Sequence, residues 1–136
     1  MNVLIIDDDE IDRESVRRAL QNNSEIKNIV QATSAQQGFK EVDKLKFDII
    51  LVDYRMPQLD GIEMIIELRS RPDLNESAIV MISTIEDDNL AISCLQAGAQ
   101  DFICKDEITP ARLRRSIIQA QKRFELEKKL YDSFCQ

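Results

Sequence analysis

Five short apolar runs, separated by longer segments with helical spacing, limit the folds that this chain can adopt. The runs are Val3–Ile6, Lys27–Val30, Ile49–Val52, Ile79–Ile82 and Phe102–Cys104. The first, third and fourth are continuous and rich in Val and Ile, which suits strands covered on both faces, as in parallel sheets. Strand and helix then alternate five times with short connections. This alternation predicts an α/β fold with a parallel sheet and right-handed crossovers.

The segments between the runs carry apolar residues at the spacing of amphipathic helices. The stripe of the first segment is Ile11, Val16, Ala19 and Leu20. Asp9 stands just before this segment and is its expected N-cap. Gly98 is well placed to end the fourth helix, and Pro110 to begin the last one.

The last helical segment is longer than packing against a sheet requires. It runs from about Pro110 almost to the C-terminus, and roughly half of that length would cover the sheet. We expect residues 1–121 to form the domain and residues 122–136 to extend its last helix. The extension carries Leu126, Leu130, Tyr131 and Phe134 among charged residues. It is a solvated tail, a homodimer contact or a linker.

Length and charge exclude several classes of protein. The 136 residues fit one domain, and no linker rich in Gly, Pro or Ser divides them. The net charge of −7, from 25 acidic and 18 basic residues, argues against a nucleic-acid-binding protein. No apolar run reaches the ~18–20 residues of a membrane span, and the acidic N-terminus is unlike a signal peptide. We therefore expect a cytoplasmic protein.

The residue types present also limit metal and disulfide chemistry. The chain has no histidine, so a metal would need oxygen or sulfur ligands. Its three cysteines, Cys94, Cys104 and Cys135, lack a CxxC spacing. This odd number without paired spacing argues against a disulfide scaffold or a zinc site.

Four of the expected strands end in charged or hydroxyl-bearing residues. These are Asp7, Asp8 and Asp9, then Asp53, then Ser83 and Thr84, and finally Lys105. Because open parallel sheets bind ligands at the carboxyl ends of their strands, we expect these residues to gather at one edge. Carboxylates without histidine or cysteine suit Mg²⁺, and a carboxylate can attack a phosphoryl group. Each residue alone also suits a solvated loop, but gathered like charges cost stability unless a cation offsets them.

Four longer stretches follow one another in a distinctive order. They are VLIIDDDE (3–10), DIILVDYRMPQLDG (48–61), IVMISTIED (79–87) and GAQDFICKDE (98–107). The second is the most specific, with an apolar strand, Asp, two residues and then Met-Pro-x-x-Asp-Gly. Together they resemble the receiver domain of response regulators in two-component signalling, in particular the single-domain, chemotaxis-regulator-like receivers. The resemblance extends from about Asn2 to about Gln121.

This resemblance implies a fold and a metal site. The fold is a flavodoxin-like, doubly wound parallel sheet with strand order 2-1-3-4-5. Asp53 would be the phospho-acceptor. Mg²⁺ would be held by Asp7, Asp8, Asp53 and the backbone carbonyl of Arg55.

The resemblance also implies a switch. Lys105 would pair with the phosphoryl group, Ser83 would be the switch hydroxyl and Phe102 the switch aromatic residue. On phosphorylation the loop after the fourth strand would shift and the Phe102 ring would turn inward. These movements would remodel the face of the fourth helix, fifth strand and fifth helix for a downstream protein or output domain. The donor would be a phosphohistidine on a sensor kinase or phosphotransfer protein, and it must lie in another chain because this one has no histidine. Such a domain is regulatory rather than an enzyme, although it assists its own phosphorylation and dephosphorylation.

Three positions depart from the family pattern. Asp106 follows Lys105 where many members have proline after a cis bond, and a cis bond to a non-proline residue costs about 2.5–4 kcal/mol. We therefore predict a trans bond or a rearranged loop. Thr84 stands where a small residue is frequent, which predicts narrower access to the phosphoryl group. Arg55 lies beside the acceptor and is expected to affect phosphoryl lifetime.

Two other functions compete with phosphoryl acceptance. One is a receiver-like binding module that is never phosphorylated. The other is a Mg²⁺-dependent phosphohydrolase resembling the haloacid dehalogenase type, with residues 7–9 as its Asp-x-Asp pattern. The hydrolase lacks support from a later acidic motif and leaves the motif at residues 53–61 unexplained.

Overall fold

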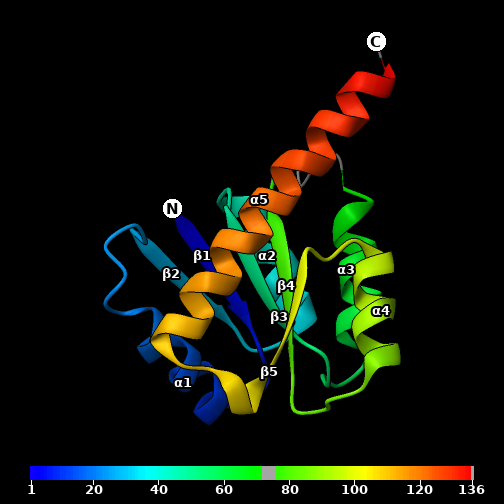
Figure 1. Cartoon of the computed structure of the whole chain (residues 1–136). Coiled ribbons are helices and arrows are strands. Elements are labelled where there is room, and N and C mark those ends of the chain that lie inside the picture. Colours follow the sequence, from blue (N-terminus) through cyan, green and yellow to red (C-terminus); the bar gives the residue numbers. More distant parts are fainter. Residues whose placement is uncertain (72–75, 136) are drawn as a thin grey trace.

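The computed structural model describes residues 1–71 and 76–135 as a parallel sheet with helices on both faces (Figure 1). The strands are β1 (Asn2–Ile6), β2 (Asn28–Ala32), β3 (Ile49–Asp53), β4 (Ala78–Ser83) and β5 (Asp101–Cys104). The helices are α1 (Glu10–Leu20), α2 (Ala35–Lys44), α3 (Gly61–Arg69), α4 (Asp88–Ala97), the 3₁₀ helix η2 (Lys105–Glu107) and α5 (Pro110–Cys135). The strand order is β2-β1-β3-β4-β5, which confirms the doubly wound fold with an extended last helix.

The three continuous apolar runs form the centre of the sheet. Every residue of β3 and β4 is buried, and so is all of β1 after its first residue. The edge strands β2 and β5 contain partly exposed residues. Since a central parallel strand is covered by helices on both faces, it must be apolar throughout, and these three sequences satisfy that demand.

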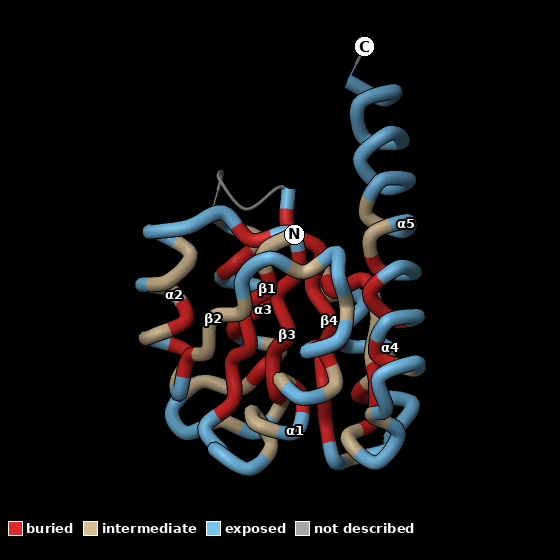
Figure 2. The backbone as a smooth tube through the Cα atoms, turned by 90° about the vertical axis from the view of Figure 1, so that its left-hand side faces the viewer, coloured by how far each residue is buried: buried red, intermediate tan, exposed pale blue. Residues whose placement is uncertain are grey.

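Two separate apolar layers hold the helices against the sheet. On one face, Val16 of α1 and Ile117 of α5 pack with side chains of the strands. On the other face, Met64 of α3 and Cys94 of α4 do the same, together with α2. Figure 2 shows the buried residues concentrated in the strands and on the inner sides of the helices. The sheet is therefore buried on both faces.

Two local predictions were wrong. β2 begins one residue later than predicted, where Asn28 pairs with Asn2. It also ends later, because the pairing with β1 continues to Ala32, whose carbonyl accepts a hydrogen bond from the Asp7 N–H, 3.1 Å away. Ile11 is 79% exposed instead of buried. It lies in the first turn of α1, and the buried residues of this helix are Val16 and Leu20.

Side chains and glycines fix where the helices begin and end. The predicted N-cap Asp9 accepts hydrogen bonds from the backbone N–H groups of Ile11 and Asp12. Gly98 ends α4 with a φ of 122°, a conformation that favours glycine. Gly61 begins α3 so close to β3 that a Cβ atom there would lie 2.6 Å from the Asp53 carbonyl oxygen. A glycine is therefore required where the chain leaves β3 and turns into α3.

The last helix continues past the sheet. α5 has 26 residues, and its buried positions end at Ala120, with Phe124 partly buried against the same layer. Figures 1 and 2 show its C-terminal part projecting away from the sheet as an exposed rod. The exposed fractions of Leu126, Leu130 and Tyr131 are 61%, 61% and 69%.

The predicted trans bond after Lys105 is confirmed. No peptide bond in residues 1–71 and 76–135 is cis, and Lys105 begins η2. None of the helices described in these ranges is long and apolar enough to cross a membrane.

Candidate functional site

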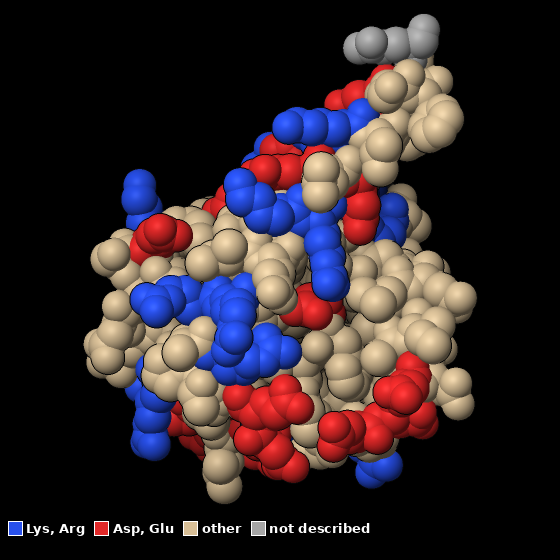
Figure 3. All heavy atoms as spheres, viewed as in Figure 1, with Lys and Arg blue, Asp and Glu red and all other residues tan. Residues whose placement is uncertain are grey.

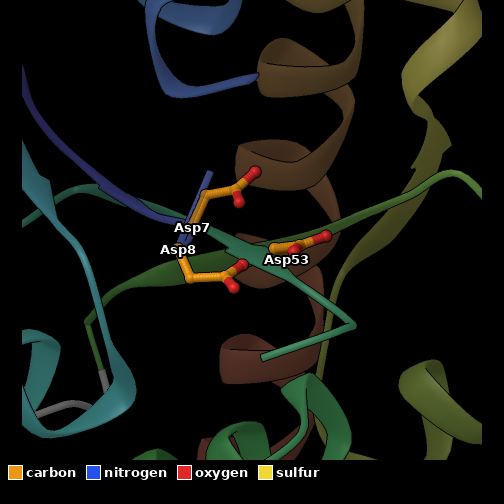
Figure 4. A group of neighbouring side chains, drawn as sticks. All are labelled: Asp7, Asp8 and Asp53. Carbon is orange, nitrogen blue, oxygen red and sulfur yellow. The ribbon is translucent and has the colours of Figure 1, made fainter. Parts of the chain in front are cut away.

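Three aspartates come together where β1 and β3 end. Ile6 of β1 pairs in register with Val52 of β3, so Asp7 and Asp53 follow on neighbouring strands. Carboxylate oxygens of Asp7, Asp8 and Asp53 lie within 4.8 Å of one another (Figure 4). Asp7 is 4% exposed and Asp53 6%, whereas Asp8 faces solvent. The prediction that these residues gather at one edge of the sheet is borne out by the geometry.

Lys105 brings a positive charge to the same place from the end of β5. Its Nζ lies 3.1 Å from Oδ1 of Asp53 and 3.0 Å from Oδ2 of Asp7. A third carboxylate, that of Asp12 in α1, lies 2.6 Å from the same nitrogen. An ammonium group has three N–H donors, and here each can meet one carboxylate.

Burial and crowding set the charge states of the acidic groups. Burial and then the negative charge of Asp7 raise the pKa of Asp53 to about 7, although Lys105 acts in the opposite direction. Burial also raises the pKa of Asp7. Burial opposes the charged form of Lys105, but its hydrogen bonds to Asp12 and Asp7 raise its pKa above the ordinary value. The site therefore has an excess of negative charge that one ammonium group does not neutralise.

The donor set fits Mg²⁺. The cluster offers carboxylate oxygens alone, from Asp7, Asp8 and Asp53, and Mg²⁺ prefers oxygen ligands while keeping several waters. Asp8 and Arg55 line one depression of about 540 Å³ beside the cluster, together with Tyr54, Met56, Pro57, Asp60 and Ile85. The backbone carbonyl of Arg55 as a ligand stays a prediction.

Ser83 ends β4 beside the acceptor strand. Asp53 pairs in register with Ile82, so Ser83 is the next residue on the neighbouring strand. It is 1% exposed, and its Oγ accepts a hydrogen bond from the Ile85 N–H at 3.0 Å. Thr84, in contrast, is exposed. The Ser83 hydroxyl therefore keeps its own proton available for another acceptor.

Phe102 is the second residue of β5. It is partly buried and packs against the apolar layer on the α2, α3 and α4 side of the sheet. Its register partner is Met81 of β4. The structure thus places Phe102 on the α4 side of the sheet, and its role in switching stays a prediction.

Two residues of α1 at this site were missed by the sequence reasoning. Asp12 contacts Lys105, and Arg13 donates from Nη1 to the Asp7 carbonyl oxygen at 2.8 Å. Arg13 Nε also donates to Oε1 of Gln31 in β2, at 3.2 Å. The sequence position of Asp12 could have indicated this contact. Asp12 follows the N-cap Asp9 by three residues and therefore lies in the first turn of α1, beside the end of β1.

Charged side chains are unevenly distributed on the face of the molecule that Figure 3 shows. Figure 3 shows acidic side chains gathered at the end of the molecule where the strands terminate. In the same view, Lys and Arg side chains gather over α5. A cation approaching the carboxyl ends of the strands therefore meets a negative surface.

Comparisons with known proteins point to one family. A family model described as response regulator receiver domain matches residues 3–118. Response regulator GacA of Pseudomonas viridiflava is 32% identical over 106 residues, covering 77% of this chain and 48% of that protein. Transcriptional regulatory protein BtsR of Escherichia coli is 31% identical over 124 residues, covering 90% of this chain and 48% of that protein. The chain thus spans about half the length of these curated relatives.

Two further matches are a solved receiver structure and a relative of which only a small part is matched. The signal receiver domain of the response regulator NarL from Mycobacterium tuberculosis superposes with a TM-score of 0.80 and 26% identity, covering 89% of this chain and 95% of that one. A protein-glutamate methylesterase/protein-glutamine glutaminase of Geobacter sulfurreducens is 30% identical over 105 residues. The match covers 77% of this chain but only 28% of that protein.

The raised pKa of Asp53 predicts how stability depends on pH. In the unfolded chain an aspartate ionises near pH 3.8, whereas in the folded protein Asp53 keeps its proton up to about pH 7. The folded state therefore binds more protons in this window, and the contribution of Asp53 to stability falls as pH rises from 3.8 to 7. Without divalent cations, Asp53→Asn should be more stable than the wild type at pH 8, by on the order of 2 kcal/mol.

Urea denaturation at several pH values would check this expectation. The gain should shrink between pH 7 and pH 4, because the folded wild type then carries a neutral carboxyl group. Asp106→Asn, which changes an exposed carboxylate of η2, serves as the control and should show no comparable gain. Equal stabilities of wild type and Asp53→Asn at pH 8 would contradict the electrostatic account of the site.

Proposed function

The chain belongs to the response regulator receiver domain family, and we propose that its Asp53 accepts the phosphoryl group. The observation that carries this assignment is the position of Asp53. It is 6% exposed, lies within 4.8 Å of two further aspartates and 3.1 Å from the Lys105 ammonium. In the described cluster, Asp8 is exposed and Asp7 follows β1, whereas the buried Asp53 ends β3, the strand that lies between β1 and β4.

The proposed reaction is a phosphoryl transfer from another chain. A carboxylate oxygen of Asp53 attacks the phosphorus of a phosphohistidine on a sensor kinase or phosphotransfer protein. The new P–O bond forms as the P–N bond breaks, and the departing imidazole nitrogen keeps the electron pair. A Mg²⁺ ion held by Asp7, Asp8, Asp53 and the Arg55 carbonyl would neutralise phosphoryl charge. The donor lies outside this chain because the chain has no histidine.

Lys105 and Ser83 would bind the oxygens of the phosphoryl group on Asp53. The Lys105 ammonium exchanges one carboxylate partner for a phosphoryl oxygen and so stabilises the negative charge of the phosphoryl group. The Ser83 hydroxyl, which accepts from Ile85 in this structure, donates its proton to another phosphoryl oxygen. This movement draws the segment after β4 towards the site.

The same movement links the site to a binding face. The segment that follows Ser83 leads directly into α4, and Phe102 packs on the same side of the sheet. A shift of this segment allows the Phe102 ring to turn inward and changes the surface of α4, β5 and α5. A downstream protein or output domain would distinguish the two states by that surface. In this role the chain is a cytoplasmic, regulatory phospho-acceptor that assists its own phosphorylation and dephosphorylation.

Intact-mass analysis after incubation with acetyl phosphate and Mg²⁺ tests the acceptor role. The wild type should gain one phosphoryl group, and removal of Mg²⁺ with a chelator should prevent it. Asp53→Ala should gain none, whereas Asp106→Asn should behave as the wild type, since Asp106 lies outside the cluster.

Two results would overturn the assignment. A folded wild type without an adduct would favour the binding module that is not phosphorylated. An adduct that persists in Asp53→Ala would favour the hydrolase alternative, with Asp7 as the nucleophile.

We further propose that residues 122–136 form an interface outside the domain of residues 1–121. In the extension, Leu126, Leu130 and Phe134 recur every four residues and therefore share one side of the helix, while Lys128 lies on the opposite side. Phe134 is 88% exposed, and an exposed apolar stripe of this kind is typical of a contact. The contact would join two copies of the chain or connect the domain to a following segment.

Sedimentation equilibrium at several protein concentrations separates these two roles. If the extension joins two copies, the average mass should rise with concentration, and Leu130→Asp should remain a monomer. Lys128→Asp places an aspartate on the opposite side of the helix and should still self-associate. A wild type that stays monomeric at every concentration would contradict the homodimer and leave the linker or the solvated tail.

A further inference from the structure

Asp12 is the closest partner of the Lys105 ammonium, although it lies outside the aspartate cluster. Its Oδ2 is 2.6 Å from Nζ, compared with 3.0 Å for Asp7 and 3.1 Å for Asp53. The group of oxygens that could hold a metal ion consists of Asp7, Asp8 and Asp53, without Asp12. Asp7 and Asp53 therefore face both the ammonium and the cation position, whereas Asp12 faces the ammonium.

The position of Asp12 is fixed by its helix. Asp9 caps α1 and accepts from the backbone N–H of Asp12, at 3.4 Å. Arg13, the next residue, bonds to the Asp7 carbonyl oxygen and to Gln31 of β2. The first turn of α1 is thus tied to the end of β1 on both sides of Asp12, and its carboxylate reaches Lys105 from a rigid element.

The three carboxylate partners of Lys105 differ in how deeply they are buried. The side chains of Asp7 and Asp53 are 5% and 6% exposed, whereas that of Asp12 is 34% exposed. Asp12 therefore lies at the rim, on the α1 side, and the other two lie deeper. An ammonium group held by Asp12 is drawn towards this rim.

We propose that Asp12 is a positioning residue that holds the Lys105 ammonium on the α1 side, so that Asp7 and Asp53 can bind a divalent cation. This inference rests on the proposed Mg²⁺ site. Without Asp12, one N–H of the ammonium would lose its carboxylate acceptor, and Lys105 would bind Asp7 and Asp53 alone. It would then compete with the cation for the same oxygens and repel it from a shorter distance.

A Mg²⁺ titration followed by backbone amide NMR shifts tests this role without any phosphorylation assay. Asp12→Asn should weaken Mg²⁺ binding about tenfold, the effect of losing one hydrogen bond between charged groups. Glu10→Gln is the matched control, because Glu10 is an exposed residue of the same helical turn and its replacement removes the same charge. This control should change the affinity by less than about twofold. The amide spectra also report whether each variant is folded.

A double-mutant cycle with Lys105→Ala separates positioning from simple charge. If Asp12 acts through Lys105, Asp12→Asn should have almost no effect on Mg²⁺ affinity in the Lys105→Ala background. Asp12→Glu keeps a carboxylate within reach of Lys105 and should restore most of the wild-type affinity. An undiminished effect of Asp12→Asn in the Lys105→Ala background would overturn the proposal, because Asp12 would then act as a general negative charge.

The remaining outcomes distinguish this inference from the proposed function. Wild-type Mg²⁺ affinity in a folded Asp12→Asn variant would overturn the role of Asp12 and leave the Mg²⁺ site intact. A folded wild type that binds no Mg²⁺ would overturn the proposed Mg²⁺ site and the role of Asp12 together. Acceptance of the phosphoryl group by Asp53 is measured separately, by intact mass.

Discussion

The parallel pairing of β1, β3 and β4 is the constraint on which the site depends. Ile6 pairs with Val52, and Asp53 pairs with Ile82, so Asp7 and Ser83 emerge on either side of Asp53. A slip of one residue would turn Asp53 to the opposite face of the sheet and bury it among apolar side chains. Because all three strands are buried on both faces, such a slip is strongly disfavoured. The same apolar packing that stabilises the sheet therefore sets the geometry of the polar residues at its edge.

The site holds charge that the fold alone does not balance. Three carboxylates meet one ammonium group, and two of them, Asp7 and Asp53, are almost fully buried. Burial and mutual repulsion raise the pKa of Asp53, so its ionised form destabilises the folded state. A divalent cation and a transferred phosphoryl group both change this balance. This unfavourable charge is the physical reason for proposing that the site binds a divalent cation and a phosphoryl group.

Much of the fold and of the site could be predicted from the sequence because each depended on local patterns. Continuous apolar runs predicted strands buried on both faces, and polar residues at their ends predicted the cluster around Asp53. Asp12 was missed because its approach to Lys105 depends on the angle at which α1 leaves β1, and sequence spacing does not contain that angle. Ile11 was placed on the buried stripe by spacing alone, but it is 79% exposed in the first turn of α1, and this helix buries Val16 and Leu20 from its later turns.

The central claim is that Asp53 is the residue that becomes phosphorylated, and chemical mapping of the modified position tests it most directly. Borohydride reduces an aspartyl phosphate to homoserine, which then marks the acceptor in peptides analysed by mass spectrometry. After treatment with acetyl phosphate and Mg²⁺, the account predicts homoserine at position 53 and unchanged aspartates at positions 7, 8 and 12. Homoserine at one of those three positions, with Asp53 unmodified, would contradict it.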